Sequence, residues 1–161
     1  MFKKFANWLK DVTGNRDCNT VQSLIEYTPV GNLDRLNYQV QKIQYVPDTK
    51  PEDNWQDLDL VMLTKKSNCQ EKCAIRVETI NTWPGWTASI IHIGFENTDK
   101  NHAQCWFTHG ELCGFADDAG IKYGYDNEPV QDAIARFYPK AIYYLLRDKY
   151  GNYLSEKILL Q

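Results

Sequence analysis

Apolar residues recur every three or four positions in five segments of this 161-residue chain, and that spacing predicts helices. The segments are 1–12, 20–27, 33–43, 69–80 and 129–137. Thr20, Asn32 and Pro129 each stand where a helix can begin. The first segment also has a short face with lysines and could lie on a membrane surface, but docking against the domain is the favoured interpretation.

Three later segments alternate apolar and polar residues or are rich in β-branched ones, which predicts strands. They cover 88–95, 102–107 and 112–116, with short polar connections, so an antiparallel meander should follow the helix over 69–80. Residues 120–128 are rich in turn formers. The segments 141–147 and 153–160 favour a hairpin, although the first would also suit a helix. The whole pattern predicts an α+β fold: N-terminal helices and a further helix packed on an antiparallel sheet.

Cys69 opens the helix that precedes these strands. Ser67 with Gln70, or Asn68 with Glu71, has the spacing of a capping box, and either pair puts Cys69 in the first turn. Backbone N–H groups and the helix dipole favour thiolate over thiol there, as a cysteine nucleophile requires.

A histidine and an aspartate follow at the ends of neighbouring predicted strands. His102 begins one strand and Asp117 ends the next, so antiparallel pairing should bring them to the same edge of the sheet. An imidazole oriented by a carboxylate can take the thiol proton and later give it to a leaving group. His92, in mid-strand, and His109, in a loop, are rival bases. The period-two alternation favours Asp117 over Asp118.

Four further residues bear on this candidate site. Cys73 is a rival nucleophile, but it lies one turn along the helix on the apolar stripe, where a core cysteine is expected. An oxyanion hole would need the backbone N–H of Cys69 and a second donor. Gln56, Trp55 and Asn54 are the candidates for that donor or for the lining of a substrate groove.

These residues resemble a known family, the bacterial transglutaminase-like cysteine peptidases, within the wider transglutaminase-like and papain-like fold. The resemblance covers about residues 37–118, and the order and spacing of its motifs carry it. The motifs are Asn37 with Ile43-Gln44-Tyr45 and Asp48, then Trp55, then Cys69 with Cys73-Ala74-Ile75, and finally His102-Ala103 followed by Asp117. Ser67, Asn68 and Gln70 stand where the family has Gly, Asp and Glu, so the acidic cluster with which some members hold calcium is mostly missing.

The resemblance implies a cysteine-dependent acyl-transfer enzyme with a Cys69, His102 and Asp117 triad, a thioester intermediate and no cofactor. Its substrate would be a peptide or protein carrying an amide or ester. Water as the acceptor would give a peptidase or amidase, which the family favours, and an amine would give a transglutaminase-type transfer. The alternative is a transglutaminase-like domain that has lost turnover and serves as a binding or structural module. The altered residues around Cys69 motivate that alternative.

Length and composition bear on domain organisation and on the partners that the protein can have. The chain fits one domain, divided by the resemblance into an N-terminal helical segment (1–32), a catalytic core (33–118) and a C-terminal extension (119–161). A net charge of −3 without a long Lys/Arg cluster argues against a nucleic-acid partner. The sequence has no signal-peptide core and no apolar stretch of about 20 residues, which predicts a cytoplasmic protein without a membrane span.

The five cysteines are an odd number without a disulfide-type spacing, so we expect reduced thiols. Structural zinc is a separate hypothesis, with Cys69, Cys73, Cys105, His109 and Cys113 as ligands. Their spacing differs from the paired Cys-x2-Cys units of zinc sites, and the cysteines fall on apolar positions, so no metal is expected.

Overall fold

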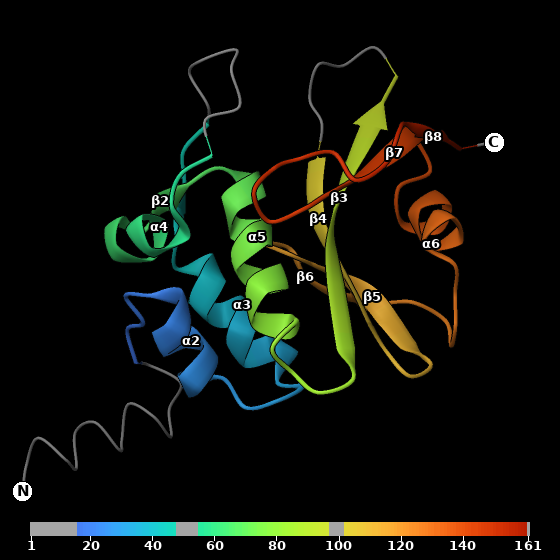
Figure 1. The fold of residues 1–161 in the computed structure, drawn as a ribbon. Helices are drawn as coiled ribbons and strands as arrows, with labels where there is room; N and C mark the ends of the chain where they lie inside the picture. The colour runs from blue at the N-terminus through green and yellow to red at the C-terminus, as the bar shows by residue number, and fades with distance from the viewer. Residues whose placement is uncertain (1–15, 48–54, 97–101, 161) are drawn as a thin grey trace, which may run out of the picture.

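The protein is built around a six-stranded sheet with helices on both faces (Figure 1). The structure is a computed structural model, and it describes residues 16–47, 55–96 and 102–160. The helices are α2 (Val21–Tyr27), α3 (Leu33–Gln41), α4 (Leu58–Thr64), α5 (Cys69–Ile80) and α6 (Val130–Phe137). The strands of the sheet are β3 (Trp86–Phe95), β4 (His102–His109), β5 (Leu112–Asp117), β6 (Gly120–Tyr123), β7 (Ala141–Arg147) and β8 (Ile158–Leu159). The predicted α+β class is confirmed. The predicted helix over 1–12 lies outside the described residues.

The strands pair antiparallel throughout, in the order β6-β5-β4-β3-β7-β8. The predicted meander β3-β4-β5 is therefore confirmed, as is the hairpin formed by β7 and β8. The chain continues from β5 into β6 and, after α6, returns along β3 as β7. The segment after residue 118 thus contributes strands to both edges of the sheet.

One face of the sheet packs against α5, with α2, α3 and α4 around that helix (Figure 1). Cross-strand partners project to the same face. Ile90 lies opposite Cys105 and His92 opposite Ala103. Ile90, Ala103 and Cys105 belong to the core that includes the buried side of α5, so His92 also projects toward α5.

The other face packs against α6. Ile91 lies opposite Gln104, and Ile93 lies opposite His102. Both isoleucines are buried with Ile134 of α6 in a second, smaller core. His102 and Gln104 therefore belong to the α6 face of the sheet.

The helix starts follow the expected local chemistry. The Thr20 side chain accepts a hydrogen bond from the Ser23 backbone N–H, and Asn32 caps α3 through the Arg35 N–H. Pro129 is the N-cap of α6. The predicted helices over 20–27, 33–43 and 129–137 are confirmed to within a few residues.

Four short elements were not predicted. α4 begins at Asp57, whose side chain accepts hydrogen bonds from the backbone of residues 59 and 60. β1 (Gln44–Tyr45) pairs in parallel with β2 (Lys66–Ser67), and β6 lies in the segment predicted to be turns. Strands of two to four residues are too short to show an alternation, so only their partners define them.

Candidate active site

Cys69 is the first residue of α5, and a reciprocal capping box between Asn68 and Glu71 stabilises this start of the helix. The Asn68 side chain accepts hydrogen bonds from the backbone N–H groups of Gln70 and Glu71. The Glu71 carboxylate accepts one in return from Asn68 N, at 2.9 Å. Of the two capping boxes that the sequence allowed, the structure has Asn68 with Glu71, while Ser67 donates its hydroxyl to the Asn68 carbonyl.

The five cysteines all lie in the described residues, and none forms a disulfide. Cys69 is partly exposed and the other four are buried. Burial raises the pKa of Cys73 well above its usual value and raises the pKa of Cys105 to about 12. Cys73 and Cys105 therefore behave as core thiols, in agreement with the sequence interpretation of Cys73.

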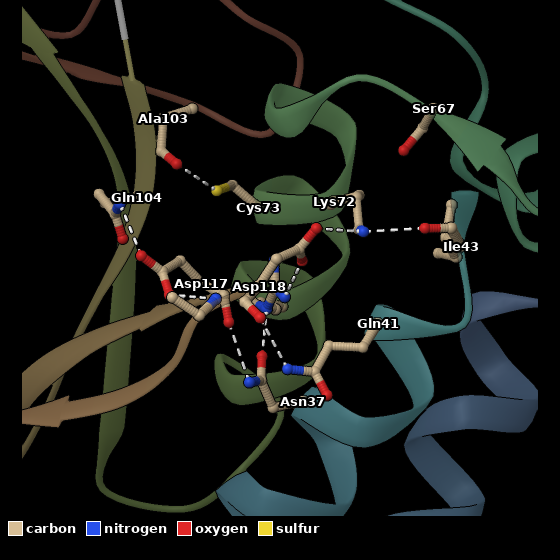
Figure 2. Close-up of polar contacts among 12 residues, drawn as sticks. Asn37, Gln41, Ile43, Ser67, Lys72, Cys73, Ala103, Gln104, Asp117 and Asp118 are labelled. Carbon is tan, nitrogen blue, oxygen red and sulfur yellow. Dashed lines mark hydrogen bonds and ion pairs between the residues drawn. The ribbon is translucent and has the colours of Figure 1, made fainter. Parts of the chain in front are cut away.

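Cys73 also shows how α5 lies against the sheet. Its sulfur donates to the Ala103 carbonyl oxygen at 3.1 Å, so the second turn of α5 touches β4 one residue after His102 (Figure 2). α5 and β4 begin at the same end of the molecule (Figure 1). Cys69, one turn before Cys73, is therefore on the side of the helix start, toward the end of the sheet where His102 begins β4.

His102 and Asp117 come together at this end of the sheet. The His102 Nε2 atom lies 3.8 Å from Asp117 Oδ2; the imidazole side chain is 46% exposed and the carboxylate side chain 7%. The distance is that of an ion pair rather than a direct hydrogen bond. Both side chains lie on the α6 face of the sheet, whereas α5 and Cys69 lie on the other face. A substrate in contact with all three would have to reach past the start of β4.

Two polar neighbours hold the Asp117 carboxylate more closely than His102 does. Gln104 Nε2 donates to Asp117 Oδ2 at 2.9 Å, and Lys122 Nζ donates to the same oxygen at 3.1 Å. The Ala119 N–H donates to Oδ1. Burial alone would raise the pKa of Asp117, but the contacts with His102, Gln104 and Lys122 outweigh it and hold that pKa well below its usual range.

Lys122 and Gln104 were missed at the level of sequence. Gln104 shares a strand face with His102, a period-two signal that was available. Lys122 lies on β6, in a segment predicted to be turns, so nothing in the sequence placed it beside Asp117. Its other partner is the Tyr138 hydroxyl, at 2.8 Å, just after α6.

The adjacent carboxylate, Asp118, fixes the end of β5 to the helices (Figure 2). It forms ion pairs with Lys72 and Arg76 of α5, both almost fully buried. Arg76 Nε also donates to the Asn37 side chain, whose amide donates to the Asp117 backbone carbonyl at 2.9 Å. This network, which we call the Asp118 anchor, joins α3, α5 and the turn that carries Asp117.

The rival histidines occupy different environments. His92 is buried on the α5 face, opposite Ala103. His109 is exposed and stacks on the Trp86 ring, with ring centroids 4.7 Å apart. Within the described residues, the histidine in contact with Asp117 is His102.

Trp55 and Gln56 lie beside the same helix start. The Gln56 backbone N–H donates at 3.3 Å to Glu71 Oε1, the other oxygen of the carboxylate that accepts from Asn68 N. Together with Leu58, Glu78 and Tyr150, they line part of a pocket of about 520 Å³, whose one lining residue from α5 is Glu78 and whose lining does not include Cys69. Asn54, the third predicted groove residue, lies outside the described residues.

Among the described residues, no group of three or more His, Cys, Asp or Glu side chains is arranged to hold a metal ion. None of the helices in that part of the chain is long and apolar enough to cross a membrane. No protein-family model, curated protein or solved structure matches this chain. The resemblance to transglutaminase-like peptidases therefore stays a prediction from the motifs.

Proposed function

We propose that this protein is a cysteine-dependent acyl-transfer enzyme with a transglutaminase-like fold, acting as a thiol hydrolase on an amide or ester of a peptide or protein. The observation that carries the proposal is that three element ends lie at the same end of the sheet, with the Cys69 side chain packed against the α5 core and the His102 and Asp117 side chains on the α6 face. There α5 begins with Cys69, β4 begins with His102, and β5 ends with Asp117.

In the proposed reaction, the Cys69 thiolate attacks the substrate carbonyl carbon. The tetrahedral intermediate collapses to a thioester as His102 gives its proton to the departing amine or alkoxide. His102 then takes a proton from water, which attacks the thioester and releases a carboxylic acid and the thiolate. An amine in place of that water would give a transglutaminase-type transfer. Asp117 holds the imidazole throughout.

Two features support these roles. Cys69 is at a capped helix start, where backbone N–H groups stabilise a thiolate. It is also partly exposed to solvent, whereas the other four cysteines are buried. The backbone N–H of Cys69, in the first turn of α5, can contribute to an oxyanion hole. Gln56, held near it through Glu71, is our candidate for the second donor.

Alkylation with iodoacetamide, with the modified site identified by mass spectrometry, tests the proposal. Exposure alone favours Cys69 over the four buried cysteines, so the pH profile is the deciding measurement. We expect labelling of Cys69 to persist at pH 6, well below the ordinary thiol pKa of about 8.5. His102→Ala should slow that labelling at pH 6 by about tenfold, since a general base or charge partner contributes at least this much.

The double variant Cys69→Ala/Gln131→Cys provides a matched control. Gln131 is exposed and lies in the first turn of α6, so the variant places a thiol at a helix start that has no histidine in the proposed role. We expect this thiol to lose its reactivity at pH 6. If both thiols follow the same pH profile, Cys69 is not activated and the enzyme proposal fails.

Two further measurements distinguish His102 from His92 as the base, and an enzyme from a binding module. Reactivity at pH 6 that is lost in His92→Gln but kept in His102→Ala would assign the base to the buried histidine. Incubation with p-nitrophenyl acetate should leave an acetyl group on Cys69, and its removal should slow in His102→Ala. A reactive Cys69 that never acquires the acetyl group would favour the alternative of a binding module.

A further inference from the structure

Lys122 contacts the candidate triad but has no role in the reaction proposed above. Its ammonium group lies 3.1 Å from Asp117 Oδ2 and 2.8 Å from the Tyr138 hydroxyl, and its side chain is 30% exposed. Tyr138 also lies beside the His102 ring, with centroids 6.4 Å apart. Lys122, Tyr138 and His102 therefore surround one carboxylate oxygen.

That oxygen already has its full complement of hydrogen bonds. A carboxylate oxygen offers two lone pairs, and Gln104 and Lys122 donate to Oδ2 at 2.9 and 3.1 Å. His102 Nε2 stays at 3.8 Å, beyond hydrogen-bonding distance. If Lys122 left, one lone pair would become available to His102.

The charge of Lys122 acts in the same direction. A protonated His102 and the Lys122 ammonium would be like charges facing the same oxygen. The other titratable groups near this end of the sheet are Cys69 and the neutral Cys73 of α5, Tyr138, and the Asp118 anchor, in which Lys72 and Arg76 face the Asp118 carboxylate. Lys122 is thus the cation that contacts Asp117 alongside His102.

The backbone keeps Lys122 in this position. β6 lies so close to β5 that a Cβ on Gly114 would stand 2.5 Å from the Lys122 carbonyl oxygen and 2.8 Å from the Phe107 ring. Phe115 lies directly opposite Lys122, so the lysine projects to the α6 face with Asp117. Only glycine at 114 permits this approach.

We propose that Lys122 is a positioning residue that acts through Asp117: it occupies the oxygen that His102 faces and so keeps the imidazole from a direct hydrogen bond with the carboxylate. The effect on His102 stands without any assumption about catalysis, and the effect on Cys69 rests on the proposed function. Loss of Lys122 should let His102 bond to Asp117 directly and so keep the protonated imidazole present to higher pH.

NMR titration of the histidine ring protons, together with Cys69 alkylation between pH 5 and 8, tests this inference. Lys122→Met removes the charge and the hydrogen bond, Lys122→Gln removes the charge but keeps a donor, and Lys122→Arg keeps both. We expect Lys122→Met and Lys122→Gln to raise the titration midpoint of His102 by about one pH unit, at the low end for a charge partner because the ring is half exposed. Lys122→Arg should leave it near the wild-type value.

Lys157→Met is the matched control, because it removes the same charge from a lysine whose ammonium lies over the Tyr143 ring. It should leave the His102 midpoint unchanged. Cys69 alkylation of the Lys122→Met protein should be faster, by up to about tenfold, near pH 7, just above the ordinary histidine pKa of about 6.5, because more of the protein then carries the imidazolium that stabilises the thiolate.

The two proposals can fail separately. An unchanged His102 midpoint in both neutral Lys122 variants would overturn the role of Lys122, whatever Cys69 does. A raised midpoint without any change in Cys69 alkylation would keep the contact between Lys122 and His102 but reject His102 as the partner of the thiol. Slower labelling near pH 7 for both neutral variants would show a merely structural role.

Discussion

The two faces of the sheet differ in size and in what they bury. The α5 face carries the larger core, in which Cys73, Cys105 and the aliphatic residues of α5 are packed together. The α6 face has a smaller core that ends in a polar cluster around Asp117. The larger core therefore lies between the sheet and α5, and the polar cluster lies at the edge of the smaller one.

Two consecutive aspartates belong to opposite sides of this division. Asp118 turns toward α5 and binds Lys72 and Arg76, while the Asp117 side chain meets Lys122 on the other face. The first contact anchors the strand end to the helices, and the second orients a titratable cluster. Adjacent identical residues can therefore have different partners, because Asp117 ends β5 while Asp118 belongs to the turn that follows.

The largest predicted effects compare the two cores directly. Ile80 of α5 and Ile134 of α6 are both fully buried. We expect Ile80→Ala to lower the free energy of unfolding by about 4 kcal/mol and Ile134→Ala by about 2–3 kcal/mol, because the thinner layer can relax into the cavity. Urea denaturation measures both free energies of unfolding, and equal m-values would show that the two variants differ in stability alone. Equal losses would mean that the α6 layer is as rigid as the α5 layer.

Removal of the Asp118 anchor should have the next largest effect. Asp118→Asn leaves two cations without their counter-charge, and the side chains of Lys72 and Arg76 are only 3% and 1% exposed. We expect a loss of about 2–3 kcal/mol, below the usual cost for a fully buried pair because Asp118 itself is half exposed. The exposed Asp126→Asn is the control and should change stability by less than about 0.5 kcal/mol. A near-zero loss for Asp118→Asn would mean that water replaces the carboxylate.

A smaller effect is expected at the start of α5. Glu71→Ala removes acceptors for the backbone N–H groups of Asn68 and Gln56, at a residue that is 1% exposed. We expect a loss of about 1–2 kcal/mol and slower alkylation of Cys69, since its helix turn would fray. Glu26→Ala, on the exposed side of α2, should change neither quantity. A loss of stability with unchanged alkylation would separate the cap from the thiol.

The smallest predicted effect appears only in acid. The folded-state pKa of Asp117 lies below its unfolded value, so its stabilising contribution is present above about pH 4 and is lost as the pH falls further. The stability difference between wild type and Asp117→Asn should therefore shrink by about 1 kcal/mol between pH 5 and 3, in urea titrations at each pH. A difference that stays constant would mean that protonation of Asp117 costs the fold nothing.

Periodicity predicted the long elements well. The helices from Val21, Leu33 and Val130, the capped start of α5 and the meander β3-β4-β5 were all visible, because each has an apolar face that its sequence displays. α4, the β1 and β2 pair, and β6 were not visible. Each of them is too short to show a pattern, and β1 and β2 are defined only by their pairing across a stretch of chain.

The sequence by itself determined that Cys69 begins a helix, since Asn68 and Glu71 are close enough along the chain to cap it. It also indicated that His102 and Asp117 end neighbouring strands. Only the tertiary structure decided what surrounds Asp117. Lys122 reaches it because β6 pairs back on β5, while Tyr138 and the α5 partners of Asp118 come from segments that meet through packing. Local hydrogen bonds act within a few residues and can be read from spacing, whereas the field at a buried carboxylate depends on every element that encloses it.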